Sequence, residues 1–239
     1  MVDDTPAALR VRTTVPFAYL NAVVCRDLPG GGDRDALIAA TRADYAAHGS
    51  PHSWYVTPAT VAAAAVRRAL ATHGLARQDC VGMAADLDRL PDPALPDACT
   101  IEEVRGEAQQ RAWGRTFVTG FGMPPAMAEA AQAALGAMPC GPGRPLRRYL
   151  ARLGGEPVTS ATLFLGGGAA GIYNVATLPA ARGRGIGAAV TLAALREGRA
   201  RGARVGVLHP SEMARSVYRR LGFAECCTWD CYREPAPDR

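Results

Sequence analysis

The last third of the chain alternates strand-like and helix-like patterns. Residues 157–165 and 172–178 are rich in apolar and β-branched side chains and are joined by three glycines, which predicts an antiparallel hairpin. The apolar positions that come next recur with the spacing of a helix that has one buried face: Ile186, Ala189, Val190, Ala193 and Ala194. An apolar run at 205–208, a second helical stripe and a strand-like tail at 223–232 complete the order hairpin, helix, strand, helix, strand.

Ahead of the hairpin, the pattern predicts two strands and two helices. The strands are expected at 99–107 and 148–153, and the helices at 108–120 and 125–138. A proline-rich segment, Leu90-Pro-Asp-Pro-Ala-Leu-Pro96, separates these elements from everything earlier and is the best internal boundary. The sequence therefore predicts a smaller αβ lobe over residues 1–92 and a second domain over 98–235.

The first ninety residues carry their own alternation of strands and helices. The predicted elements are, in order, a strand at 17–28, a helix at 33–48, a strand at 54–57, a helix at 60–73 and a strand at 80–87. Part of this order is repeated at the end of the chain. In both places a strand ends in X-Pro, a helix follows, and a glycine with an apolar residue leads into the next strand. Pro58 and Gly74 match Pro210 and Gly222. A diverged duplication and an accidental likeness of two αβ units both remain open.

Composition places the chain among ordinary globular proteins. Of its 239 residues, 49% are hydrophobic and 21% charged, and no window of 18 uncharged apolar residues is available to span a membrane. The start, Met1-Val-Asp-Asp-Thr, is acidic and leads into no apolar segment, so we expect a cytoplasmic protein without membrane partners. All 27 basic residues are arginine, and the net charge of +5 is too dispersed to predict nucleic-acid binding.

The seven cysteines show no spacing typical of a metal site. They are Cys25, Cys80, Cys99, Cys140, Cys226, Cys227 and Cys231. Their number is odd, and no CxxC pair or zinc module is present. Reduced thiols and no bound metal are therefore expected.

One motif has a composition suited to binding an anion. Arg182-Gly-Arg-Gly-Ile-Gly187 stands between the predicted strand that ends near residue 178 and the next predicted helix. A helix amino end presents backbone amides without internal partners, and glycines let a phosphate approach them closely. The arginines add positive charge beside the same anion. A glycine-rich strand-to-helix turn is often only a turn, so the motif alone does not decide the function.

Two common nucleotide-binding folds do not fit this motif. A P-loop requires Gly-Lys-Ser/Thr, and the chain has no lysine. A dinucleotide-binding fold is disfavoured because the preceding elements read as an antiparallel hairpin and no acidic residue stands about twenty positions further on.

A second motif makes the interpretation of the loop more specific: Ala214-Arg-Ser-Val-Tyr-Arg-Arg-Leu-Gly-Phe223. Over roughly the last three-fifths, the chain resembles the GCN5-related N-acetyltransferase (GNAT) family. The resemblance lies in the order of its parts: a strand, Pro179, RGRGIG, a helix, a strand, a helix bearing Tyr218 and then Leu-Gly-Phe. The resemblance implies an α/β (α+β) fold, with a mixed, mostly antiparallel sheet flanked by helices. The first lobe then resembles a degenerate half-domain, because it lacks the loop and has Leu70 where Tyr218 stands.

The resemblance also implies roles for particular residues. Acetyl-CoA would lie with its pyrophosphate on the loop and its pantetheine arm and thioester along the preceding strand. These cofactor-binding positions are Val175, Ala176, Thr177, Arg182, Gly183, Arg184, Gly185, Ile186, Gly187 and Ala188. Tyr218 matches the tyrosine that protonates the departing thiolate, for which a phenol is a suitable donor. A core aromatic is the alternative role for this residue.

The chain departs from the family at the general base and at one further position. Ser211 stands where many members have asparagine, and the strand before the loop carries no carboxylate. His209 is the best substitute, since it ends the neighbouring predicted strand and its ordinary pKa suits proton removal from an ammonium group. A histidine that only packs in the turn, Glu212 as the base, or water alone are the alternatives.

Five residues are candidates for contact with the acceptor. The family's first two helices usually cover the acceptor, and this places Trp113, Phe117 and Phe121 there, with helix packing as the equal alternative. Tyr173 and Asn174 lie on the strand before the loop, which in the family separates from its neighbour. Trp54 and Tyr55 of the first lobe are expected in its core, and an acceptor pocket is the less favoured role.

The sequence thus predicts an acetyl-CoA-dependent N-acetyltransferase. The acceptor would be a small molecule with an amine or related nitrogen, such as a secondary metabolite or an antibiotic, and transfer would be direct within a ternary complex. Two rival functions remain open: a non-catalytic acyl-CoA-binding or sensing module, and a protein or aminoacyl-group transferase. The oligomeric state is not predicted.

Overall fold

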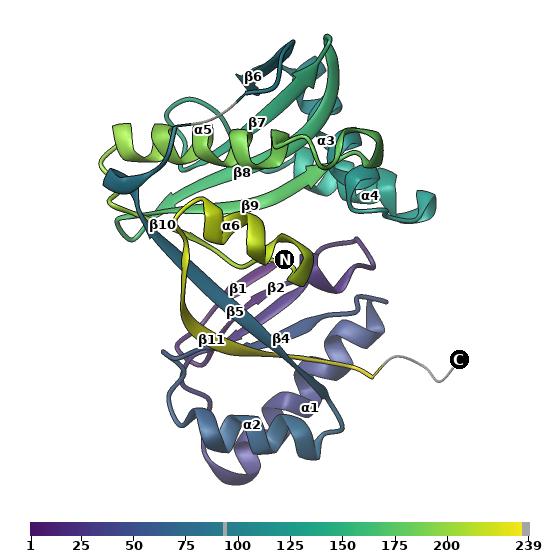
Figure 1. Cartoon of the computed structure of the whole chain (residues 1–239). Helices are drawn as coiled ribbons and strands as arrows, with labels where there is room; N and C mark the ends of the chain where they lie inside the picture. Colours follow the sequence, from purple (N-terminus) through teal and green to yellow (C-terminus); the bar gives the residue numbers. More distant parts are fainter. Residues whose placement is uncertain (93–94, 236–239) are drawn as a thin grey trace. The chain divides into compact units, whose positions relative to one another are not determined.

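The computed structural model describes residues 1–92 and 95–235. The chain divides into two compact units. The first contains Met1–Val81 together with the chain from Cys227 onward, and the second is Gly82–Cys226. Most helices and strands of each unit are labelled in Figure 1. Among the described residues, no helix combines the length and the apolar character that a bilayer crossing requires.

The first unit is a small sheet with two helices. Its strands are β1 (Val2–Asp4), β2 (Ala8–Val11), β3 (Ala22–Cys25), β4 (Ser53–Val56), the beginning of β5 (Ala76–Asp86) and the end of β11 (Ala224–Arg233), and its helices are α1 (Gly31–Ala47) and α2 (Ala63–Thr72). The pairs β1–β2, β2–β3 and β4–β11 are antiparallel, and β3–β4 is parallel. Side chains of both helices form one apolar core with the strands, centred on Trp54, Tyr45, Ile38 and Leu70.

The second unit contains the longer strands. They are β6 (Cys99–Glu103), β7 (Leu146–Leu153), β8 (Glu156–Gly166), β9 (Ala169–Thr177) and β10 (Val205–Leu208), and the helices are α3 (Glu107–Gly120), α4 (Pro125–Gly136), α5 (Ile186–Ala200) and α6 (Arg215–Arg220). The strand order is β5-β10-β9-β8-β7-β6. Only β9–β10 is parallel, and the other pairs are antiparallel. This mixed, mostly antiparallel sheet with flanking helices is the predicted α/β architecture.

Helices pack on both faces of this second sheet. On one face, a side chain at Gly198 of α5 would meet Ala170, Leu163 and Leu165, so the helix lies close against β8 and β9. On the other face, the indole Nε1 of Trp113 on α3 donates to the carbonyl oxygen of Ala161 at 2.9 Å. Since neighbouring residues of a strand point to opposite faces, each of the central strands is buried on both sides.

The two units share an order of elements that extends further than the sequence echo indicated. In each, an antiparallel strand pair is followed by a helix, a strand parallel to the second of the pair, another helix and a final strand. The matching series are β2-β3-α1-β4-α2-β5 and β8-β9-α5-β10-α6-β11. This shared topology favours duplication over the accidental likeness that the sequence left open.

The final strands of the two series are exchanged between the units. The end of β5 pairs with β10, with Asp86 opposite Val205, whereas the end of β11 pairs with β4, with Cys231 opposite Tyr55. The compact units therefore differ from the predicted division into 1–92 and 98–235. The first unit includes the end of β11, which the prediction placed in the second domain, and the second unit includes the end of β5, which the prediction placed in the first lobe. Residues 93–94 of the proline-rich segment lie outside the described residues, and the segment carried no information on which strands pair.

Most other differences from the predicted elements concern short or polar segments. β1 and β2 were missed, because strands of three and four residues are too short to show apolar alternation. Asp3 and Asp4 of β1 form ion pairs with Arg10 and Arg26. The strand expected at 17–28 is only β3, preceded by a 3-10 turn at Ala18–Leu20. Further 3-10 turns occur at Leu87–Arg89, Pro179–Ala181 and Glu212–Ala214, the last of which shortens α6 to Arg215–Arg220.

Candidate active site

Strand β9 contains a bulge close to its carboxyl end. Its pairing with β8 shifts between Ser160 and Thr162, and Asn174 has a φ of +54°, a left-handed conformation that is uncommon outside glycine. The Ser160 hydroxyl donates to the Asn174 carbonyl oxygen at 3.0 Å, and the Asn174 side-chain amide donates to the Thr162 hydroxyl at 3.3 Å. Two side chains of β8 therefore hold the backbone of β9 in this irregular shape.

The bulge changes which face of the sheet the following residues meet. Ala170 lies against Gly198 of α5, whereas Ala176, an even number of positions further on, lies against Gly120 of α3. A regular strand would place both on the same face, so the extra residue at the bulge reverses the alternation. Val175 and Thr177 consequently point toward Gly187 at the start of α5, where their nearest side-chain atoms lie 3.8 and 3.4 Å from the position that a Cβ of this glycine would occupy.

Strands β9 and β10 separate beyond their first residues. Their parallel pairing joins Ala169–Gly171 to Val205–Val207, and β9 then continues to Thr177 while β10 ends at Leu208. The bulge lies in this part of β9 that β10 does not pair with. A gap of this kind leaves main-chain donors and acceptors of β9 available to an extended ligand, as strand addition at a sheet edge does.

The loop after β9 exposes backbone amides at the start of α5. Gly183 and Gly185 have φ angles of +74° and +76°, and the space where their side chains would stand is open. The first intrahelical bond runs from Ala189 N to Gly185 O, which leaves the amides of residues 186–188 without an intrahelical acceptor. Ile186 is buried and anchors the helix beneath this exposed turn. Open amides and a helix amino end fit the diphosphate of a coenzyme A thioester.

The two arginines of the loop differ in what they contact. Arg182 donates from Nε to the carbonyl oxygen of Thr177 at 3.0 Å and from Nη2 to that of Gly120 at 2.9 Å. Its guanidinium therefore joins the end of β9 to the end of α3, a structural role that the sequence did not predict. Arg184 is exposed on the loop and lies close enough to Cys99 for its charge to favour the thiolate of that residue.

Tyr218 lies on α6 with its ring buried. The ring packs edge-to-face on Phe223 at a centroid distance of 5.9 Å, and its hydroxyl hydrogen-bonds to Thr191 of α5. Thr191 in turn donates to the carbonyl oxygen of Gly187 at 2.8 Å. Burial raises the pKa of Tyr218, opposed by the Thr191 hydroxyl, so the phenol keeps its proton at neutral pH. Its hydroxyl is thus connected through Thr191 to the first turn of α5.

Comparison with known proteins identifies the segment that holds these features. The sequence model of the "Acetyltransferase (GNAT) family" matches residues 126–223. Residues 126–223 therefore match the sequence pattern of a GNAT domain. The match includes β9, the glycine loop, α5 and Tyr218, and it supports acyl transfer as the general reaction class. No curated protein sequence matches the chain significantly.

Solved structures show the same fold over nearly the whole chain. A GCN5-related N-acetyltransferase from Kribbella flavida has a TM-score of 0.70 at 20% identity, covering 99% of this chain and 90% of its own. One from Sphaerobacter thermophilus has a TM-score of 0.68 at 20% identity, covering 98% and 79%. A tandem GNAT protein from the clavulanic acid biosynthesis pathway has a TM-score of 0.60 at 17% identity, covering 91% and 76%. The predicted GNAT fold is thereby confirmed, and a two-lobe arrangement has a precedent.

His209 follows β10 on the side of the second unit where that strand parts from β9. The residue as a whole is exposed, but neighbouring atoms cover part of its ring, and this burial lowers the pKa of His209 below its ordinary value, which favours the neutral imidazole at pH 7. Glu212, the alternative base, is 83% exposed and forms an ion pair with Arg215 at 2.9 Å. Of these two groups, the neutral imidazole is the better proton acceptor, and its role as the base stays a prediction.

The aromatic residues predicted to contact the acceptor divide into two kinds. Trp113 and Phe117 are 0% and 3% exposed and stack on each other at 5.4 Å, so the structure favours helix packing for both. Phe121, at the end of α3, is exposed and follows Gly120, which contacts Ala176 of β9. Tyr173 is 44% exposed with its ring over Gly171, and Asn174 has its side chain turned to Thr162 at the bulge.

The residues that sequence reasoning missed act on the backbone. Ser160 holds the bulge, Gly120 lets α3 approach Ala176, where a Cβ would lie 2.9 Å from its methyl group, and Thr191 contacts Tyr218. No motif marks these positions, because their function depends on partners that are distant in the sequence. Asn174 carried the one available signal, since asparagine tolerates the left-handed conformation better than most residues.

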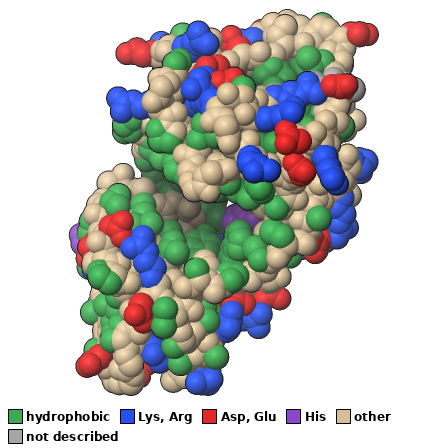
Figure 2. All heavy atoms as spheres, turned by 90° about the vertical axis from the view of Figure 1, so that its left-hand side faces the viewer, with side chains coloured by type: hydrophobic (Ala, Val, Ile, Leu, Met, Phe, Trp, Pro, Cys, Tyr) green, Lys and Arg blue, Asp and Glu red, His purple; other side chains and the backbone are tan. Residues whose placement is uncertain are grey.

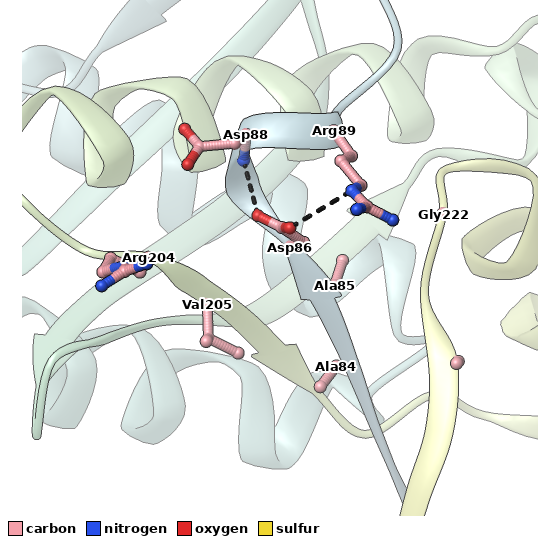
Figure 3. A pocket seen from close by; sticks show the side chains of 9 residues that line it. Ala84, Ala85, Asp86, Asp88, Arg89, Arg204, Val205 and Gly222 are labelled. Atoms are coloured by element: carbon pink, nitrogen blue, oxygen red, sulfur yellow. Dashed lines mark hydrogen bonds and ion pairs between the residues drawn. The ribbon is translucent and has the colours of Figure 1, made fainter.

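The second unit also carries a surface pocket of about 770 Å³ (Figure 3). Ala84 and Ala85 of β5, Val205 of β10 and Gly222 line it. Its acidic groups have partners, since Asp86 accepts from the amide of Asp88 and pairs with Arg89, and Asp88 pairs with Arg199. Val205 pairs with the first residue of β9, about 26 Å along that strand from Thr177. The pocket is therefore separate from the glycine loop.

On the face shown in Figure 2, charged side chains of one sign do not gather into a large patch. There, arginine side chains stand beside aspartate and glutamate. Among the described residues, many arginines form ion pairs with acidic side chains, such as Arg196 with Asp92 and Arg152 with Glu102, both at 2.7 Å. Within the described part of the chain, no cluster of three or more His, Cys, Asp or Glu side chains is arranged to hold a metal ion.

Proposed function

We propose that this protein is an acetyl-CoA-dependent N-acetyltransferase whose acceptor is a small molecule with an amine or related nitrogen. The observation that carries the proposal is the combination, on one strand–loop–helix unit, of a bulged strand, a gap beside it and a helix amino end with open amides. A thioester of coenzyme A needs each of these features in this order, because its diphosphate is anionic and its pantetheine arm is extended and rich in amide groups.

Each part of the site would have its own task. The amides of residues 186–188 and the charge of Arg184 would bind the diphosphate. Main-chain groups at Val175, next to the bulge, would bind the arm and polarise the thioester carbonyl. Tyr218, neutral at pH 7, would give its proton to the departing thiolate. His209, also neutral, would take the proton of the attacking ammonium group.

Direct transfer in a ternary complex is the mechanism that these residues support. The amine would attack the thioester while both substrates are bound, so no residue of the chain would become acylated. We place the reaction in the cytoplasm and assign it no metal ion. A protein that binds acetyl-CoA without turning over any amine would be the non-catalytic module that the sequence left open.

The decisive experiment uses two glycines at opposite ends of α5. Gly185 and Gly202 both have positive φ, +76° and +89°, and both have open space around the missing side chain. An alanine at either position costs about 1–2 kcal/mol of backbone strain. Only Gly185→Ala also places a methyl group beside the amides of the loop. We expect isothermal titration with acetyl-CoA to show binding about tenfold or more weaker for Gly185→Ala than for Gly202→Ala.

The result has a clear negative outcome. Equal affinity of the two variants would show that the loop does not hold the diphosphate. If wild-type protein binds acetyl-CoA, a panel of small amines assayed for release of free coenzyme A then tests the transfer itself. Binding without release over the whole panel would replace the transferase by a binding module.

A further inference from the structure

The guanidinium of Arg182 connects two elements of the second unit. Its Nε donates to the carbonyl oxygen of Thr177, the last residue of β9, at 3.0 Å. Its Nη2 donates to the carbonyl oxygen of Gly120, the last residue of α3, at 2.9 Å. Because the guanidinium is planar and rigid, the two hydrogen bonds fix the two chain ends relative to each other.

The chain ends that Arg182 joins also touch directly. A Cβ at Gly120 would lie 2.9 Å from the methyl group of Ala176 and 3.4 Å from the amide nitrogen of Thr177, so the backbones of α3 and β9 meet there. We call this contact of Gly120 with Ala176 and Thr177 the α3–β9 contact. The last carbonyls of a helix lack intrahelical donors and favour a nearby positive charge. Arg182 therefore caps α3 while it holds the end of β9.

Arg184 of the same loop provides the contrast. Both arginines are exposed, but within the described part of the chain Arg184 takes part in no hydrogen bond or ion pair. Its five N–H donors stay available to an anion, whereas Arg182 has already committed two of its nitrogen atoms to main-chain carbonyls. Two arginines that the sequence shows as equivalent thus differ in what they can do.

We infer that Arg182 is a positioning residue for acetyl transfer, which holds the strand end beside the thioester against the helix end beside the acceptor. The inference rests on the proposed function, which places the thioester along β9. The acceptor belongs beside the end of α3, where the exposed Phe121 directly follows Gly120. A misplacement of about 1 Å between reacting groups can cost about 100-fold in rate, so a fixed α3–β9 contact is a condition for turnover.

A lysine in place of Arg182 separates positioning from charge. Lysine keeps the positive charge of the loop, but its single ammonium nitrogen cannot occupy the places of both Nε and Nη2. Arg182 is exposed, so water can replace its donors at both carbonyls and the variant should fold. Arg184→Lys is the matched control, because it makes the same change in the same loop and leaves the α3–β9 contact intact.

The first measurement is amide hydrogen exchange of the free full-length proteins, read by mass spectrometry. In Arg182→Lys we expect peptides that cover residues 118–123 and 174–178 to exchange about threefold faster than in wild type, because both ends of the α3–β9 contact are released together. Arg184→Lys should exchange at wild-type rates in both peptides. Wild-type rates in Arg182→Lys would overturn the inference, whether or not the protein binds acetyl-CoA.

The second measurement compares acetyl-CoA affinity with turnover. Since the inference gives Arg182 no contact with the diphosphate, Arg182→Ala and Arg182→Lys should both bind acetyl-CoA within about threefold of wild type in isothermal titration. With an amine that the wild type acetylates, kcat should fall about tenfold in both variants, and the charge of the lysine should not restore it.

The opposite results are equally distinct. An acetyl-CoA affinity that falls about tenfold in Arg182→Ala and is restored in Arg182→Lys would show that the side chain acts as a charge on the diphosphate, which refutes the inference. A wild-type kcat in Arg182→Lys would refute it as well. If the wild type binds no acetyl-CoA, the proposed function fails, and hydrogen exchange alone then decides whether Arg182 fixes the α3–β9 contact.

Discussion

The helices α1 and α5 both follow a strand and a glycine-rich turn, yet only one of the two turns has the features of an anion site. Before α1, β3 pairs with β4 along its whole length, from Ala22 to Cys25. Before α5, β9 pairs with β10 over its first three residues and then continues alone to Thr177. Both turns contain glycines with open space around them. Glycine content is thus shared, and the gap beside the strand is what distinguishes the second unit.

The helices that follow the parallel strands show the same contrast. α2 and α6 are each preceded by proline and followed by a glycine of positive φ, Gly74 at +79° and Gly222 at +91°. At the matching position inside the helix, Leu70 is part of the apolar core of the first unit, whereas Tyr218 connects through Thr191 to the start of α5. The comparison indicates that the first unit keeps the packing of these elements and lacks the side chain that is proposed to act in catalysis.

The largest effect on turnover should come from removing the hydroxyl of Tyr218, which Leu70 lacks at the matching position of the first unit. Tyr218→Phe keeps the ring against Phe223 and removes the proposed proton donor, so we expect turnover to fall about 100-fold. The dissociation constant for acetyl-CoA should stay within about twofold of wild type, since the loop is unchanged. Leu70→Met is the matched control in the first unit and should leave turnover unaltered. Full activity of Tyr218→Phe would remove the contrast between the two helices.

A second change tests whether the first unit serves mainly for stability. Asp230 is 3% exposed and forms ion pairs with Arg67 and with Arg77, the latter at 2.6 Å. Burial raises its pKa, but the hydrogen bonds from both arginines outweigh this and lower it. Asp230→Asn should lower the free energy of unfolding by about 2 kcal/mol in urea titrations at pH 7.

Its control is Asp79→Asn, which removes an exposed partner of the same Arg77 and should cost less than about 0.5 kcal/mol. Acetyl-CoA affinity should be unchanged in both variants. A loss of affinity in the folded Asp230→Asn protein would contradict the division of roles between the units.

The smallest effect is a pH dependence of stability that originates in the first unit. His52 is buried, stacks on Tyr45 at 4.2 Å and accepts a hydrogen bond from Trp54 Nε1 at 3.0 Å. Burial lowers its pKa, so the unfolded chain binds a proton more readily than the folded one. Stability should therefore be complete above about pH 6.5 and fall below it by at most about 1.4 kcal/mol per pH unit.

Thermal unfolding between pH 5 and 8 measures this dependence. His52→Gln offers Trp54 an acceptor that does not titrate and should flatten the curve. A wild-type melting temperature that is constant from pH 8 to pH 5 would show that His52 contributes nothing to it.

The sequence was sufficient to predict the second unit and the position of its glycine loop. Hydrophobic periodicity located β8, β9, α5 and β10 to within a few residues, because these elements are long or end at Gly and Pro. It could not predict the bulge at Asn174, because Ser160 and Thr162, which hold it, lie on another strand. For the same reason the sequence placed Arg182 beside the ligand, although two of its donors contact main-chain carbonyls.

The exchange of β5 and β11 also sets an order on how the protein can form during synthesis. The first unit emerges first from the ribosome, but the strand segment that pairs with β4, around Cys231, is translated about 175 residues later. The nascent chain must hold an unpaired edge at β4 over that interval, with its main-chain groups exposed to wrong partners. Folding of the first unit is therefore completed only after β11 has been translated, when the second unit has had time to form most of its sheet.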